Sequence, residues 1–181
     1  MFEPRPKPVT LVVLDGWGIA APSRGNAISQ AVTPVFHKLV ATYPTMALQA
    51  AGEAVGLPWG EMGNSEVGHL TLGSGKIIYQ PLPRINRAII DGSFFQNETL
   101  LQSCRVAAGE GKTLHLIGLV SSGGVHSSID HLYALLELAK NEHVPRTVVH
   151  AILDGRDTPY DSGKKFMSEL EAKMKKMKYG K

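Results

Sequence analysis

The N-terminal part of the chain carries one short apolar run, one amphipathic stretch and one glycine-rich stretch. Residues 9–15 (VTLVVLD) are apolar and mostly β-branched up to a final acid, which predicts a buried strand that ends in a turn. Between residues 26 and 42 apolar residues recur at helical spacing, which predicts a helix, although Pro34 argues against a straight one. Residues 52–75 are rich in glycine, and we expect a helical turn or two after Ser65.

From about residue 80 the pattern changes to helices alternating with strands. The expected elements are helices over 85–95 and 98–111, a strand over 113–122, a helix over 127–143, a strand over 146–157 and a helix over 162–181. The last helix has lysines opposite an apolar face formed by Phe166, Met167, Leu170, Met174 and Met177. Strands that alternate with helices predict an α/β fold, here a three-layer α/β/α arrangement with mostly parallel sheets.

The composition excludes several classes of protein. With 181 residues, of which 43% are apolar and 19% charged, the chain is too apolar to be disordered and has the length of one good-sized domain or two small ones. Its one cysteine, Cys104, cannot form an internal disulfide, so we expect a reducing compartment and a cytoplasmic location. The apolar runs are far shorter than the ~20 residues that cross a bilayer.

The net charge of +3 does not indicate a nucleic-acid partner. Residues 163–181 hold seven lysines and two glutamates, a local balance of +5, whereas residues 1–162 have a balance of −2. The basic side chains therefore belong to one face of the last helix, and such a face is usually solvated. We expect neither a nucleic-acid nor a membrane partner.

The segment GNSEVGH (63–69) presents a serine between small residues. If a helix begins at Glu66, Ser65 lies at its N-terminus, where backbone N–H groups favour an anion such as a phosphoryl group. A serine can also be activated by a metal ion, and Asp15 is a plausible ligand for a hard cation. The alternatives are a helix cap at Ser65 and a turn-forming aspartate at Asp15.

Polar clusters follow both of the strongest predicted strands, where ligands bind in α/β sheets. Residues 120–131 (VSSGGVHSSIDH) offer backbone N–H groups, hydroxyls and imidazoles suited to phosphate or carboxylate, or they form only a glycine loop and a helix cap. His126 and His131 are five residues apart and do not share a helical face, so a two-histidine metal site is not expected.

The second cluster is LDGRDTP (153–159). Arg156 presents a guanidinium suited to a carboxylate or phosphate, and Asp157 can accept hydroxyl hydrogens. The alternative is a local Asp–Arg pair within a turn.

Six segments together resemble the N-terminal part of cofactor-independent (2,3-bisphosphoglycerate-independent) phosphoglycerate mutases, in that family's order. They are VTLVVLDGWG, RGNAI with a following TP, GEAVGLPWGEMGNSEVGHLTLGSG, IYQPLPRI, VSSGGVHSSIDHL and VVHAILDGRDTP. The resemblance implies an isomerase of the alkaline phosphatase superfamily. Such an enzyme interconverts 3-phosphoglycerate and 2-phosphoglycerate in glycolysis and gluconeogenesis, through a phosphoserine and without 2,3-bisphosphoglycerate.

The resemblance also implies a set of cofactors and site residues. Two divalent metal ions would assist, usually manganese, with magnesium or cobalt as alternatives. Ser65 would be the catalytic nucleophile, and Asp15 and Ser65 would both bind one metal. His126, Arg156 and Asp157 would bind the phosphoglycerate.

By the same resemblance the chain holds parts of two domains. Residues 1–79 would be the N-terminal segment of the metal-binding phosphatase domain, and residues 80–181 the first part of the inserted substrate-binding (transferase) domain. Family members are longer and typically monomeric, and their further metal ligands have no counterpart here, so we expect the isolated chain to be inactive or to need a C-terminal complement. Two alternatives are another metal-dependent phosphatase or phosphomutase of this superfamily, and a non-catalytic remnant or split-enzyme subunit.

Overall fold

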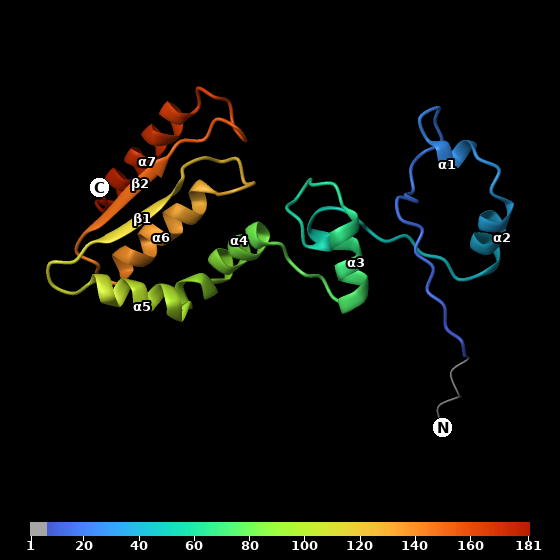
Figure 1. Ribbon diagram of the computed structural model, residues 1–181, viewed down its shortest axis with the longest axis horizontal. Helices are drawn as coiled ribbons and strands as arrows, with labels where there is room; N and C mark the ends of the chain where they lie inside the picture. Colours follow the sequence, from blue (N-terminus) through green and yellow to red (C-terminus); the bar gives the residue numbers. More distant parts are fainter. Residues whose placement is uncertain (1–6) are drawn as a thin grey trace. The chain divides into compact units, whose positions relative to one another are not determined.

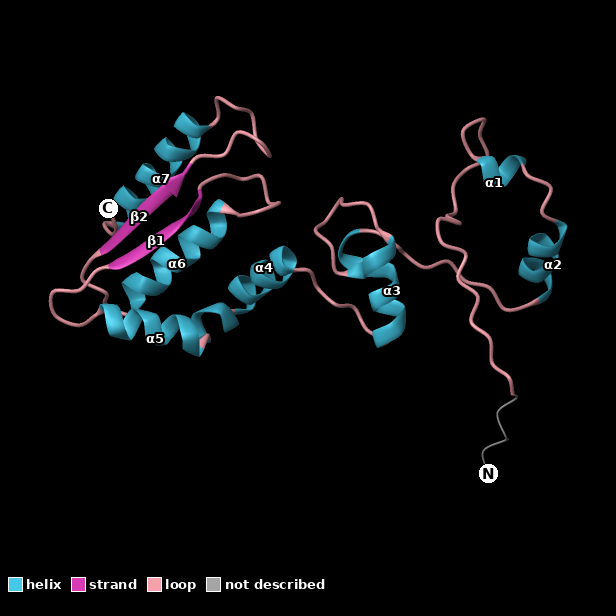
Figure 2. Cartoon of the chain, in the orientation of Figure 1, coloured by secondary structure: helices cyan, strands magenta, loops and turns pink. Residues whose placement is uncertain are grey.

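The structure is a computed structural model that describes residues 7–181 (Figure 1). The chain divides into two compact units, one up to Gln49 and one from Ala50 to Lys181. Helices and loops make up the described part of the first unit, and the second unit also contains the strands (Figure 2). Among the described residues, no helix is long and apolar enough to span a membrane.

In the first unit, the predicted helix over residues 26–42 is two helices, α1 (Ala27–Gln30) and α2 (Pro34–Thr42). The Asn26 side chain caps α1 by accepting a hydrogen bond from the backbone N–H of Ser29 at 3.2 Å. α2 begins at Pro34, because proline lacks the N–H that a helix interior needs and disfavours helical backbone at the residue before it. The expected departure from one straight helix is confirmed.

The predicted strand over residues 9–15 is wrong. These residues form no strand, and the side chains of Val9 and Leu11 are 80% and 78% exposed. A strand needs a neighbour that takes its backbone hydrogen bonds, and in the described part of the chain the two strands pair with each other. The predicted turn after the run is present, since the N–H of Trp17 donates to the carbonyl oxygen of Leu14 at 3.1 Å.

The second unit contains the predicted alternation of helices and strands. Its elements are η1 (Gly52–Val55), α3 (Ser65–Ser74), α4 (Pro81–Asp91), η2 (Ser93–Gln96), α5 (Glu98–Ala107), β1 (Leu114–Leu119), α6 (Ile129–Asn141), β2 (Thr147–Ile152) and α7 (Gly163–Met177). The helix expected after Ser65 and each element expected after residue 80 are therefore present. They differ from the predictions by a few residues at their ends, where sequence signals are weakest.

The sheet confirms the predicted parallel pairing. β1 and β2 lie in register from Leu114 beside Thr147 to Leu119 beside Ile152, and α6 connects them. The free edge of β2 also receives the backbone of Lys181, whose N–H donates to Thr147 and whose carbonyl oxygen accepts from the N–H of Val149. The hydrogen bonds of β2 thus extend to a further parallel segment of the chain. The α/β class is confirmed.

The helices α5, α6 and α7 cover one face of this sheet. Leu116, Val149 and Ala151 point to that face and pack against buried residues of α6 and α7, while Leu114 packs against α5 and α6. Successive strand residues point to opposite faces, and the other face is open: Ile117 is 75% exposed and Ile152 49% exposed. Within the second unit, no helical layer covers this open face.

The helix α7 uses the apolar face that its spacing predicts. Phe166 and Leu170 are buried, and Met174 and Met177 pack against them. After α7 the chain turns so that Tyr179 packs against both apolar clusters beside the sheet, the one that contains Leu138 and the one that contains Leu136. Its hydroxyl group lies 2.8 Å from the Val144 carbonyl oxygen, to which it donates, and 2.8 Å from Oγ1 of Thr147. The end of the chain is therefore held against the sheet by packing and by hydrogen bonds.

Candidate active site

Ser65 is the first residue of α3, but the helix cap is its neighbour Asn64. The Asn64 side chain accepts a hydrogen bond from the N–H of Val67 at 3.0 Å, so the alternative that the Ser65 hydroxyl caps the helix is wrong. Val67 is 4% exposed and packs with Val55 and Leu57, which holds this short helix in place. The start of the helix therefore does not depend on the Ser65 hydroxyl.

A close backbone approach explains the glycine before Asn64. A Cβ atom on Gly63 would overlap the carbonyl oxygen of Ala50, far inside the contact distance. Only glycine fits here, and it brings the segment that precedes α3 against residue 50. The position of the serine thus depends on the residue two places before it.

The hydroxyl of Ser65 lies 3.1 Å from Nδ1 of His69, one helical turn on. The same Nδ1 atom is 2.7 Å from the carbonyl oxygen of Ser65, and because a carbonyl oxygen can only accept, this contact requires a proton on Nδ1. A protonated Nδ1 cannot receive the hydroxyl proton. His69 is therefore not placed as a base for Ser65.

Asp15 lies in an exposed turn of the first unit, whereas Ser65 belongs to the second. The two units are described separately, so the metal site that Asp15 and Ser65 would share stays a prediction. A carboxylate and a hydroxyl are hard oxygen donors that suit manganese or magnesium, but such ions take about six ligands. No group of three or more His, Cys, Asp or Glu side chains that could hold a metal lies among residues 7–181. Asp15 and Ser65 each offer an oxygen donor of the kind that such an ion takes.

The two polar loops predicted as binding loops meet at one edge of the sheet. Because β1 and β2 are parallel, the loops that follow them, 120–128 and 153–162, leave the same edge. Nε2 of His126 lies 3.7 Å from Oδ2 of Asp157. The His126 side chain is 57% exposed and that of Asp157 15%. The structure thus brings together two of the three residues predicted to bind substrate.

Arg156, the third residue predicted to bind substrate, directly precedes Asp157 and is exposed. Its backbone N–H donates to Oδ1 of Asp154 at 2.9 Å, and within the described residues its guanidinium makes no ion pair. The alternative of a local Asp–Arg ion pair is therefore wrong. An exposed guanidinium on the residue before Asp157 can take up a carboxylate or a phosphate with two hydrogen bonds.

Asp154 lies outside the set of site residues that the sequence predicts. Its Oδ1 atom accepts from the backbone N–H groups of Gly155, Arg156 and Asp157 at 2.7, 2.9 and 3.1 Å. Its Oδ2 atom accepts from the hydroxyl of Ser121 at 2.8 Å. These hydrogen bonds, first that from Arg156 and then that from Ser121, lower the pKa of Asp154 to about 2. An aspartate followed by glycine indicates such a turn, but the contact with Ser121 has no local sequence signal.

His131, the second histidine of the first loop motif, has a structural contact. It lies on α6, and its Nε2 atom is 2.6 Å from Oδ1 of Asn86 on α4. Burial lowers the pKa of His131, which favours the neutral ring. His131 therefore joins the helices α4 and α6.

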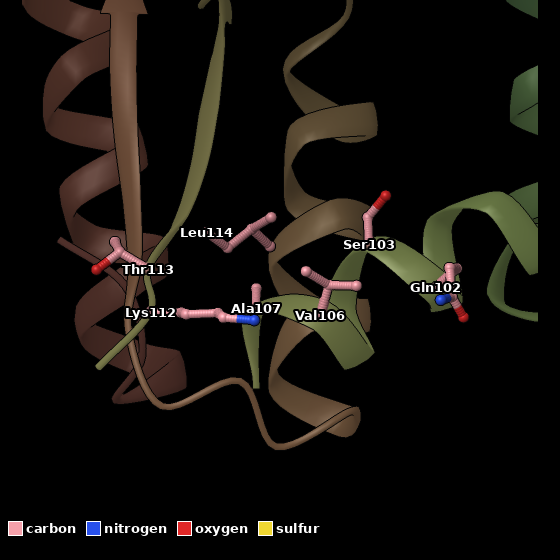
Figure 3. Close-up of a pocket in the computed structure, with 7 residues that line it drawn as sticks. All are labelled: Gln102, Ser103, Val106, Ala107, Lys112, Thr113 and Leu114. Carbon is pink, nitrogen blue, oxygen red and sulfur yellow. The ribbon is translucent and has the colours of Figure 1, made fainter. Parts of the chain in front are cut away.

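A surface hollow of about 520 Å³ lies elsewhere in the second unit (Figure 3). Its lining comes from α5 and from the residues that lead into β1: Gln102, Ser103, Val106, Ala107, Lys112, Thr113 and Leu114. It therefore lies at the amino end of β1, whereas the two binding loops leave the carboxyl ends of the strands. None of the predicted site residues lines it, and we assign it no function.

These features define a class of protein. It is an α/β protein in which the loops at the carboxyl edge of a parallel strand pair bring an imidazole and a carboxylate together, at the edge of such sheets where ligands bind. A family model described as BPG-independent PGAM N-terminus matches residues 85–181, more than half of the chain. The chain belongs to this family, the BPG-independent phosphoglycerate mutases.

Relatives match over almost the whole chain. A 2,3-bisphosphoglycerate-independent phosphoglycerate mutase of Clostridium beijerinckii is 55% identical over 97% of this chain, and one of Synechocystis is 51% identical over 99%. The chain spans about a third of the length of these relatives, 34% in both cases. It is also similar to Leishmania mexicana phosphoglycerate mutase, solved at low cobalt concentration, with a TM-score of 0.59 and 40% identity over 84% of this chain and 28% of that one.

Proposed function

We propose that this chain supplies the nucleophile and part of the substrate site of an enzyme that interconverts 3-phosphoglycerate and 2-phosphoglycerate. The observation that carries the proposal is the meeting of His126 and Asp157 at the carboxyl edge of the strand pair. It occurs in a chain more than half identical to mutases that are named as independent of 2,3-bisphosphoglycerate. We infer that this enzyme needs no 2,3-bisphosphoglycerate either.

The proposed reaction begins at Ser65. Its Oγ atom attacks the phosphorus of 3-phosphoglycerate, the bond from phosphorus to the substrate oxygen breaks, and that oxygen takes up the proton that the serine loses, so that glycerate and phosphoserine result. The phosphoryl group then returns to the other hydroxyl of glycerate, which gives 2-phosphoglycerate and restores the serine. His69 is not placed to take the hydroxyl proton, and a bound cation would lower the pKa of the hydroxyl.

Asp15 and Ser65 would hold one of two divalent metal ions. Manganese is the metal we expect, with magnesium or cobalt as alternatives, and the Leishmania mexicana protein was solved in the presence of cobalt. When bound, such ions stabilise a serine alkoxide and neutralise the charge of a transferred phosphoryl group. Further ligands would have to complete the coordination.

The two binding loops, which follow β1 and β2, would hold the glycerate part of the substrate. The Arg156 guanidinium suits the carboxylate of glycerate, and the Asp157 carboxylate can accept hydrogen bonds from its hydroxyls. His126 would contact the same group from the other loop, 3.7 Å from Asp157. Glycerate held in this way could present either hydroxyl to the phosphoserine without leaving the site.

We assign residues 1–79 to the metal-binding domain and residues 80–181 to the substrate-binding domain. This boundary falls just before Pro81, the first residue of α4, whereas the compact units of the structure divide after Gln49. We propose a monomeric, cytoplasmic enzyme of glycolysis and gluconeogenesis. Its partner is a small molecule rather than nucleic acid or a membrane.

An activity assay tests the proposal. We expect the 181-residue chain alone, with manganese and 3-phosphoglycerate, to form no 2-phosphoglycerate in an enolase-coupled assay. Co-expression with the remaining C-terminal portion of the Clostridium beijerinckii relative should restore turnover. The restored activity should disappear in a Ser65→Ala variant, and turnover that survives this substitution would refute the role of Ser65.

A second candidate is a subunit of a split enzyme, and one feature of the sheet favours it. The open face carries exposed apolar side chains, including Ile117 and Ile152. Restored activity on co-expression supports a subunit that needs a complement, whereas persistent inactivity of a soluble pair supports a non-catalytic remnant. Release of phosphate without isomerisation would instead indicate another phosphatase of this superfamily.

A further inference from the structure

We propose that Asp154 is a positioning residue that holds the two binding loops, 120–128 and 153–162, in a single arrangement, with Ser121 as the bridge between them. The inference rests on the proposed function, because it concerns the site that would hold phosphoglycerate. Asp154 acts through the residues around it and does not itself touch the substrate.

One carboxylate oxygen shapes the second loop. Oδ1 of Asp154 accepts from three consecutive backbone N–H groups, at 2.7, 2.9 and 3.1 Å, so residues 155–157 fold around it. The backbone N–H groups of Arg156 and Asp157 point to the Asp154 carboxylate. The Arg156 residue is exposed, and the Asp157 side chain reaches His126 in the neighbouring loop. The local turn thus orients both of the substrate-binding candidates that it contains.

The other carboxylate oxygen joins the two loops. Oδ2 accepts from the hydroxyl of Ser121, which lies 33 positions earlier in the chain and is 1% exposed. The Ser121 oxygen in turn accepts from the N–H of Gly123 at 3.3 Å. One chain of hydrogen bonds therefore runs from the backbone of the first loop to the backbone of the second.

The glycine in the first loop shows how closely the loops approach. A Cβ atom on Gly123 would lie 2.9 Å from Cβ of Asp157 and 3.2 Å from Oδ2 of Asp154. No larger residue fits while the Ser121–Asp154 bond is in place. This approach sets the position of His126, three residues on, beside Asp157.

The charge of Asp154 matters as well as its shape. A carboxylate with 9% exposure is stable when ionised only if donors surround it, and here four donors do so. An asparagine at this position has nearly the same shape but a weaker acceptor, and its NH₂ group would face a hydroxyl that now donates. We therefore expect Asp154→Asn to make the two loops more mobile, while the predicted substrate-binding residues stay at the same edge of the sheet.

NMR of the whole 181-residue chain tests the positioning role without any ligand. The readout is the nuclear Overhauser contact between Gly123 and Asp157, together with the downfield amide protons of residues 155–157. Asp154→Asn should weaken both signals. Ser121→Ala should remove the contact between the loops and keep the downfield amides, so it decides the question even if Asp154→Asn does not fold.

Matched controls separate this effect from general damage. Asp161→Asn removes an exposed carboxylate nearby, and Ser168→Ala removes a hydroxyl that bonds within α7. Both should leave the contact between the loops unchanged. If the contact persists in Asp154→Asn and in Ser121→Ala, the proposal is wrong.

Binding of 3-phosphoglycerate to the same proteins links the positioning to function. Loss of one buried hydrogen bond between the loops should weaken binding about tenfold in Ser121→Ala and leave both controls unchanged. Unchanged affinity in both loop variants would also overturn the inference. If the unsubstituted chain does not bind 3-phosphoglycerate, the substrate assignment for this chain fails, and the loop contact alone decides the positioning role.

Discussion

Replacing Leu136 by alanine tests whether the helices cover one face of the strand pair. Leu136 lies on α6, is fully buried, and packs with Val120, Phe166 and Leu170. Truncation to alanine removes three carbon atoms, worth roughly 2.4 kcal/mol at about 0.8 kcal/mol per buried carbon. The cavity that remains raises the expected loss of unfolding free energy to about 3–4 kcal/mol.

Ile117 provides the matched control, because it lies on β1 but points to the open face and is 75% exposed. Ile117→Ala should cost less than about 1 kcal/mol, since little apolar surface is lost and only the strand preference changes. Urea unfolding, followed by far-UV circular dichroism, measures the unfolding free energy of each variant relative to the unsubstituted chain. Equal losses for the two variants would mean that both faces of the sheet are covered, which would refute the one-sided packing.

Three further predictions concern single side chains. The folded-state pKa of Asp154, about 2, lies below its ordinary 3.8, so its ionised form stabilises the fold above about pH 4, and this contribution is lost as the pH falls toward 2. As the pH is lowered through this window, the unfolding free energy should therefore fall more steeply for the unsubstituted chain than for Asp154→Asn. Parallel curves for the two proteins would contradict the assignment. Tyr179→Phe should cost about 1–2 kcal/mol in the same urea assay, because the buried Thr147 hydroxyl and the Val144 carbonyl lose a partner; a change below about 0.3 kcal/mol would show that water replaces the hydroxyl. Gly63→Ala should displace the start of α3, since the new Cβ meets the Ala50 carbonyl oxygen, and unchanged amide shifts for residues 64–67 would contradict that packing.

Much of the second unit follows from local sequence patterns. Helical spacing over 162–181 and the β-branched run over 146–157 predict α7 and β2 because each pattern encodes the face that is buried. The parallel pairing and the meeting of the two binding loops follow as well, since strands joined by a helix run parallel and their loops leave one edge. These inferences need only the order of the elements.

Features that depend on distant contacts could not be predicted. The run 9–15 has the composition of a strand, but pairing requires a neighbour that the run itself does not encode. The cap at Asn64 in place of Ser65 depends on backbone angles at two adjacent polar residues. The role of Asp154 depends on Ser121, which no spacing rule connects to it.

The central claim is that Ser65 carries the phosphoryl group. The direct measurement is mass spectrometry of the peptide containing Ser65, after the chain co-expressed with the C-terminal portion of a relative is quenched in acid during turnover of 3-phosphoglycerate with manganese. We expect one added phosphoryl group on Ser65 and none in a Ser65→Ala variant. Turnover with the phosphoryl group on another residue, or with no phosphorylated intermediate, would contradict it.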